Sequence, residues 1–137
     1  MFFKKNYQII QLSIICLIFV SLLFGIVNVS AATISKTLTA SHSTTSINAT
    51  TKYYTNEIQR WSVGNPVLVS TGGKGGSASK SGAPSTSQSG VKYYVTQSYS
   101  VSATDYNYNT TSVKRKLQWC VNSSTNTFVS AECKAVY

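Results

Sequence analysis

Side chains alternate between residues 91 and 103, and this alternation constrains the fold of the 137-residue chain more than any other feature. With one exception, every second position carries an apolar or aromatic side chain. These positions are Val91, Tyr93, Val95, Tyr99, Val101 and Ala103. A period of two residues places them on one face of a β-strand, opposite a face of serine, threonine and lysine that only Tyr94 interrupts. The segment therefore predicts a sheet with one buried face. The exception, Gln97, predicts a bulge or a sheet edge.

Further short strands are predicted on both sides of this segment. A strand over residues 112–121 has one face that Arg115 interrupts and that otherwise consists of Val113, Leu117, Trp119 and Val121. Another strand follows over residues 127–136, and weaker alternation occurs before residue 70. Helix-forming residues are sparse, whereas threonine, serine, valine and tyrosine, which favour strands and turns, dominate. The chain is therefore predicted to be all-β, as a small antiparallel β-sandwich or a barrel-like domain.

Residues 71–90 interrupt this pattern, because they contain six glycines and six serines. A segment of this composition buries too little apolar surface to order itself. It is predicted to be a flexible loop or a linker. The predicted organisation is a signal peptide at 1–31, N-terminal strands at 32–70, the loop or linker at 71–90, and a C-terminal β-meander with one disulfide at 91–137.

The first 31 residues have the pattern of a secretory signal peptide. Lys4 and Lys5 precede an apolar run over residues 9–27, and small residues follow it up to Ala31. The apolar run partitions into the membrane, while the lysines keep the N-terminus in the cytoplasm. Cleavage after Ala31 predicts a secreted, extracellular protein. The run is also long enough to span a bilayer, so an uncleaved anchor is the alternative.

Cys120 and Cys133 are the cysteines that remain after this cleavage. An exported chain meets conditions that permit disulfides, and the two residues lie on predicted strands that flank a short loop. They are predicted to form one disulfide, which would stabilise the fold by about 3 kcal/mol. The chain has one histidine, His42, and no zinc-ligand spacing. Neither a metal site nor a cofactor is expected.

Catalytic groups are sparse in the predicted mature chain. Its acids are Glu57, Asp105 and Glu132, and no local motif pairs two carboxylates or brings a nucleophile next to a base. We therefore expect no enzymatic activity. A secreted hydrolase that uses two of these acids is kept as a third hypothesis.

The predicted mature chain is strongly basic. Cleavage of the signal peptide removes Lys4 and Lys5. Ten of the twelve lysines and arginines then remain with three acids, which gives a net charge of +7. This charge favours anionic partners, and because the chain is exported no nucleic-acid partner is expected. The candidate binding residues are Lys114, Arg115, Lys116, Trp119, Tyr106 and Tyr108. In the alternative, Leu117 and Trp119 belong to the core and the cations form a solvated strand edge.

Two functions fit these features. The first is a secreted cationic protein that binds an anionic polymer of a cell envelope or a membrane surface, with an antimicrobial or bacteriocin-like role. The alternative is a non-enzymatic extracellular surface, matrix or adhesion protein that binds a protein or a glycan through its aromatic side chains. Salt separates the two, because it screens the first kind of binding far more than the second. The residues leave the ligand and the oligomeric state open.

Overall fold

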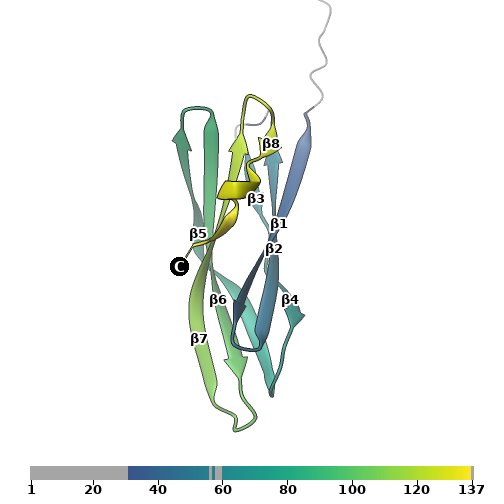
Figure 1. Ribbon diagram of the computed structural model, residues 1–137, viewed down its shortest axis with the longest axis vertical. Coiled ribbons are helices and arrows are strands. Elements are labelled where there is room, and N and C mark those ends of the chain that lie inside the picture. Colours follow the sequence, from purple (N-terminus) through teal and green to yellow (C-terminus); the bar gives the residue numbers. More distant parts are fainter. Residues whose placement is uncertain (1–30, 56, 58–59, 137) are drawn as a thin grey trace, which may run out of the picture. The chain divides into compact units, whose positions relative to one another are not determined.

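The computed structural model describes residues 31–55, 57 and 60–136, which are almost entirely β-strand (Figure 1). In this part of the chain the strands form two antiparallel sheets, which confirms the all-β prediction. The predicted signal peptide lies outside the described residues, except for Ala31. Among the residues described, no helix is long and apolar enough to cross a membrane.

The first sheet is built around a central strand that pairs on both sides. Its strands are β1 (Thr33–His42), β2 (Thr45–Tyr54), β3 (Trp61–Val63) and β4 (Val67–Ser70). β1 pairs with β2 along its whole length, from the Thr33–Tyr54 pair to the His42–Thr45 pair. β3 and β4 follow one another and also pair with β2.

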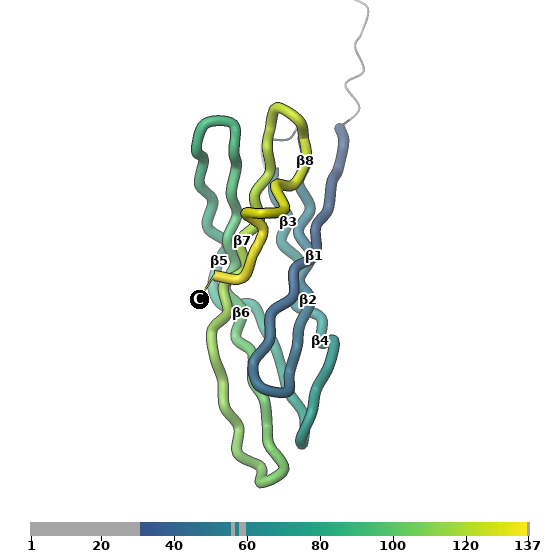
Figure 2. The backbone as a smooth tube through the Cα atoms, in the orientation of Figure 1, coloured from purple at the N-terminus to yellow at the C-terminus, as the bar shows by residue number. Residues whose placement is uncertain are grey.

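The second sheet runs in chain order and ends in a short C-terminal segment. Its strands are β5 (Gly75–Ser89), β6 (Lys92–Thr104), β7 (Thr110–Asn122), β8 (Thr127–Phe128) and β9 (Lys134–Val136). β8 and β9 both pair with β7. The 3-10 helix η1 (Ser130–Glu132) connects β8 to β9, and Figure 2 shows this segment following β7 back along its length. Within the described residues the two sheets have separate hydrogen bonding and do not close into a barrel.

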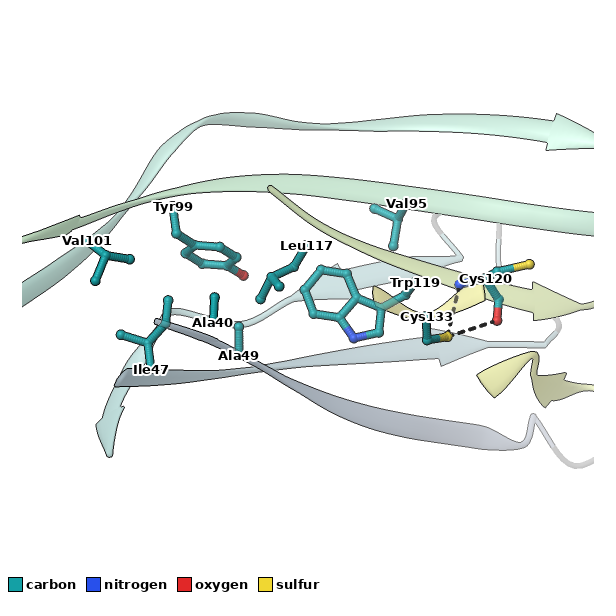
Figure 3. Packing of buried hydrophobic residues seen from close by; sticks show 10 residues of the cluster. All are labelled: Ala40, Ile47, Ala49, Val95, Tyr99, Val101, Leu117, Trp119, Cys120 and Cys133. Carbon is teal, nitrogen blue, oxygen red and sulfur yellow. Dashed lines mark hydrogen bonds between the residues drawn. The ribbon is translucent and has the colours of Figure 1, made fainter. Parts of the chain in front are cut away.

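Side chains from both sheets fill one hydrophobic core (Figure 3). The first sheet contributes Ala40, Ile47 and Ala49. The second sheet contributes Val95, Tyr99, Val101, Leu117 and Trp119. Removing this apolar surface from water is the main force that holds the sheets together.

The buried face predicted on β6 is confirmed. Val95, Tyr99 and Val101 are fully buried, and Ala103 is 4% exposed. Val91 differs, because it lies in the turn between β5 and β6 and is 50% exposed. The alternation therefore predicts a strand that begins earlier than β6 does.

Two large side chains of the second sheet donate hydrogen bonds across the core. Their acceptors are backbone carbonyls in β1 and directly after β3. The Trp119 indole Nε1 donates a hydrogen bond to the Lys36 carbonyl at 3.0 Å. The Tyr99 hydroxyl donates to the Gly64 carbonyl at 3.1 Å. Burial raises the pKa of Tyr99 to about 12, because the phenolate would lose its hydration. Both bonds satisfy polar atoms that would otherwise be buried without a partner, so they also restrict how one sheet can slide over the other.

The loop or linker predicted over residues 71–90 is wrong for most of its length, because residues 75–89 form β5. β5 pairs with β6 from Gly75–Thr104 to Ser89–Lys92. The Gly- and Ser-rich composition led to a wrong prediction because it ignores the neighbouring strand. A strand that pairs with a well-packed neighbour is ordered by backbone hydrogen bonds to that neighbour. Small residues also suit the position, since a Cβ on Gly76 would lie 2.1 Å from Thr45 Oγ1.

Of the two alternatives predicted at Gln97, a bulge or a sheet edge, the structure has a bulge, which lies in β5 opposite Gln97. The β5–β6 pairing passes from Ser81–Ser98 to Ser85–Thr96, so residues 82–84 stand opposite Gln97 alone. Gly82 has a φ of +76°, a conformation that favours glycine. The Gln97 side-chain Nε2 donates to the Gly82 carbonyl at 3.0 Å. The Gln97 amide nitrogen therefore bridges β6 to the bulge, while its Oε1 is buried without a hydrogen-bond partner.

The two cysteines lie next to each other as buried free thiols. The Cys120 N–H donates to Cys133 Sγ at 3.3 Å, and Cys133 Sγ donates to the Cys120 carbonyl at 3.5 Å. Figure 3 shows the Cys120 sulfur pointing away from Cys133. Burial raises the pKa of both thiols. The predicted disulfide stays a prediction, and its formation would require the Cys120 side chain to turn towards Cys133.

Candidate functional site

The outer face of the second sheet carries rows of hydroxyl and ammonium groups. On β7, Leu117 and Trp119 point into the core, so Lys114 and Lys116 point to the opposite side. The same alternation places serines of β5 and β6 on this side. We call this surface the lysine–serine face, and its residues are Ser77, Ser79, Ser81, Ser98, Ser100, Ser102, Ser112, Lys114, Lys116 and Lys134.

Strand register arranges these side chains in rungs across β5, β6 and β7. Ser79, Ser100 and Lys114 form one rung, because each pairs with the next across the sheet. The rung beside it is Ser81, Ser98 and Lys116, and the third is Ser77, Ser102 and Ser112. Adjacent members of a rung are about 4.8 Å apart, and successive rungs are about 7 Å apart. The result is a repeating array of hydrogen-bonding groups on a twisted sheet, in which the Ser102 and Ser112 hydroxyls bond to each other at 2.5 Å.

Lys134 joins the face from the C-terminal segment. It stands opposite Gln118 on β7, while its neighbour Ala135 packs against the core. Lys134 therefore shares the outer side with Lys114 and Lys116. It is not among the sequence-predicted site residues, because the short segment Lys134-Ala135-Val136 does not alternate clearly enough to reveal its face.

Acidic side chains do not neutralise this face. Among the described residues the one salt bridge joins Lys92 to Glu132, and the Tyr94 hydroxyl also donates to Glu132 at 2.5 Å. These two hydrogen bonds lower the pKa of Glu132. Lys114 and Lys116 are exposed and take part in no such pair in the described structure. Their positive charge is therefore open to an external anion.

The six candidate binding residues do not form one surface. Trp119 is fully buried, which confirms the alternative that it belongs to the core together with Leu117. Arg115 also lies on the inward side of β7, and its Nε donates to the Ser41 carbonyl at 2.9 Å. The sequence pattern already indicates that Lys114 and Lys116 face one way and that Arg115 points with the core residues of β7, and the structure has this arrangement.

Tyr106 and Tyr108 lie in the turn between β6 and β7 and are 75% and 73% exposed. Lys74 Nζ lies 5.2 Å from the centre of the Tyr108 ring, a cation–π contact. The two tyrosines therefore present their rings to solvent at the end of the sheet, beyond the rungs that carry Lys114 and Lys116.

Two of the three acids cannot act as a carboxylate pair. Glu132 contacts Lys92 at the start of β6, and Asp105 follows the last residue of β6. A strand of this length spans about 40 Å, whereas the carboxyl groups of glycoside hydrolases lie within about 10 Å of each other. In the described part of the chain, no three His, Cys, Asp or Glu side chains are grouped so that they could bind a metal ion.

Comparison with known protein families, with characterised proteins and with solved structures finds no significant match to this chain. A functional proposal therefore depends on the geometry of its own surfaces.

Proposed function

We propose that this protein is exported, that its mature part is a β-sandwich, and that the lysine–serine face binds an anionic polymer of a cell envelope. The observation that carries the proposal is the set of exposed lysines with hydroxyl groups in register beside them. Lysine ammonium groups attract phosphate or carboxylate groups, and serine hydroxyls donate hydrogen bonds to the same oxygens.

The arrangement supports a polymer better than a bilayer. Between the Ser77–Ser102–Ser112 rung and the Ser81–Ser98–Lys116 rung, the outward positions of β5, β6 and β7 are serine or lysine. Membrane-binding surfaces add apolar or aromatic side chains that enter the acyl region. A repeating anion, by contrast, can follow the rungs and contact a cation or a hydroxyl at each one.

Matched charge variants test this function. The triple variant Lys114→Gln, Lys116→Gln and Lys134→Gln removes three cations from the face. The control triple, Lys36→Gln, Lys52→Gln and Lys74→Gln, makes the same change in net charge elsewhere. Binding to poly(glycerol phosphate), to heparin and to phosphatidylglycerol vesicles is measured by titration calorimetry at low and high salt.

We expect the face variant to bind the polymers about 100-fold more weakly, since each lysine near an anionic surface contributes about 1 kcal/mol. The control should lose less than about tenfold, and binding by the wild type should weaken as salt is added. Equal losses in the two triples, or no polymer binding at low salt, would refute the assignment. Stronger binding to vesicles than to either polymer would move the function to a membrane surface.

The antimicrobial role is a separate part of this proposal. It predicts growth inhibition of cells whose envelope contains the bound polymer, and loss of inhibition in the face variant. Binding without inhibition would leave an envelope-binding protein. The alternative of a surface, matrix or adhesion protein predicts binding to a protein or glycan that persists at high salt.

A further inference from the structure

Three turns meet at one end of the strands and enclose a small pocket. Figures 1 and 2 show the β1–β2, β4–β5 and β6–β7 connections at this same end. The pocket has a volume of about 280 Å³, and all three connections line it. Its walls include Ser43 and Thr44 from the first turn, Gly73 from the second, and Asp105, Tyr106 and Asn109 from the third. We call it the turn pocket.

Hydrogen bonds between the turns hold the pocket open in one shape. The Gly72 N–H donates to the Thr44 carbonyl at 3.2 Å, and the Lys74 N–H donates to the Thr104 carbonyl at 2.9 Å. Gly73 between them has a φ of +63°, and a Cβ at this position would lie 2.3 Å from the Thr104 carbonyl oxygen. Only glycine allows this approach. The pocket is therefore preorganised, which reduces the entropy lost when a ligand binds.

Asp105 organises the wall that carries Tyr106. Its Oδ1 accepts the N–H groups of Asn107 at 2.8 Å and Asn109 at 2.9 Å, and its Oδ2 accepts the Asn109 side-chain amide at 3.2 Å. The bonds from Asn109 contribute most to lowering the pKa of this carboxyl. Asp105 is thus an anion at the pocket wall, which disfavours an anionic ligand and favours one that donates hydrogen bonds.

The remaining groups of the pocket match the chemistry of a sugar. Ser43 and Thr44 provide hydroxyls that can both donate and accept, as sugar hydroxyls do. Thr111 also lines the pocket, and its Oγ1 is hydrogen-bonded to His42 Nε2 at 2.8 Å. Tyr106 lines the pocket and is 75% exposed, so its ring offers an apolar surface to the C–H groups of a pyranose. We propose that the turn pocket binds one neutral hexose unit of a glycan, stacked on Tyr106 and hydrogen-bonded by the polar wall.

The proposal is independent of polymer binding by the lysine–serine face, because ligand class and site both differ. A neutral ligand carries no charge for salt to screen, so its affinity should stay constant when salt is added. Loss of one activity in a variant would thus leave the other intact, and the two proposals can fail separately.

Tyr106 and Tyr108, two tyrosines of the same turn, supply a matched pair of variants for the test. Protein produced from the full 137-residue chain is titrated by NMR with methyl glycosides of glucose, galactose, mannose and N-acetylglucosamine, up to tens of millimolar. We expect at least one sugar to bind, with roughly tenfold weaker binding in Tyr106→Ala. Tyr106→Phe keeps the ring and Tyr108→Ala leaves the pocket lining intact, so both should bind within about threefold of the wild type.

Chemical-shift changes locate the site even where an alanine variant folds poorly. Sugar addition to the wild type should shift the amide signals of Ser43, Thr44, Gly73 and Asn109. No binding by any sugar, shifts confined to the lysine–serine face, or equal binding by Tyr106→Ala and the wild type would overturn the proposal. An equal loss in Tyr108→Ala would also overturn it, because that residue does not line the pocket.

Discussion

Glu132 shows how a single residue connects the C-terminal segment to the sheet. It lies in η1, and its carboxylate binds Lys92 and Tyr94 on β6. The ammonium of Lys92 and the hydroxyl of Tyr94 lower the pKa of this carboxyl below its ordinary value of 4.5. A lowered pKa means that the unfolded chain binds the proton more tightly than the folded one.

The pH dependence of stability follows from that difference. The contribution of Glu132 is fully present above about pH 4.5 and is lost as the pH falls through the lower pKa of the folded state. Urea denaturation from about pH 6 to about pH 3 should show a steeper loss of unfolding free energy in the wild type than in Glu132→Gln. Glu57→Gln removes the same charge at an exposed position and serves as the control. A wild-type slope no steeper than that of Glu132→Gln would contradict the prediction.

The redox state of Cys120 and Cys133 also depends on the orientation of a single side chain. Cys133 Sγ already contacts the backbone of Cys120, and only the Cys120 sulfur points elsewhere. We predict that the protein forms the disulfide when it folds under oxidising conditions, and that reduction lowers its unfolding free energy by about 3 kcal/mol. Mass spectrometry before and after alkylation, followed by denaturation with and without reductant, measures both. Alkylation of both thiols in folded, unreduced protein would show that the bond does not form.

At the scale of elements, β5 shows how a neighbour can order a segment that has little apolar surface. Its small residues let it approach the first sheet closely, and Gly76 is the tightest point. A Cβ there would lie 2.1 Å from Thr45 Oγ1 and 2.8 Å from the Ser102 carbonyl oxygen. Thr45 is fully buried, so its side chain has little room to move away.

Gly76→Ala should therefore destabilise the fold by about 2 kcal/mol, as overpacking of a filled interior does. Adding Thr45→Ala removes the hydroxyl that the new Cβ meets, so the double variant should recover part of the loss. Chemical denaturation of both single variants and the double variant gives this coupling energy directly. Strictly additive effects would show that the two side chains do not meet.

At the scale of the whole molecule, net charge opposes folding. Residues 32–137 carry ten cations and three acids, and one of those acids is paired in the described structure. Like charges at this density repel in the compact state. Screening by salt should then raise the unfolding free energy between about 10 mM and about 150 mM ionic strength.

The face variant checks this reasoning, because Lys114→Gln, Lys116→Gln and Lys134→Gln lower the net charge from +7 to +4. Its stability should rise less with salt than that of the wild type. Thermal unfolding at matched ionic strengths measures both. A wild type that loses stability as salt is added would show that attractive pairs outweigh the repulsion.

Local pattern determined that the chain forms strands, which face of β6 is buried, and that the pattern is broken at Gln97. These features follow from the period of two residues and from a polar side chain that breaks it, so they could be read without the tertiary structure. The same is true of the net charge and of the sparse catalytic groups.

Three features were decided only by the tertiary structure. They are the formation of an ordered strand by residues 75–89, the lysine–serine face and the turn pocket. Each depends on register or on contacts between segments far apart in the chain, as when β5 pairs with β6 or when Thr44 meets Gly72. The sequence pattern indicates which side chains share one face of a strand. It does not indicate which other strand pairs with that strand. That information arises from packing and from backbone hydrogen bonds, which form only when distant segments come together.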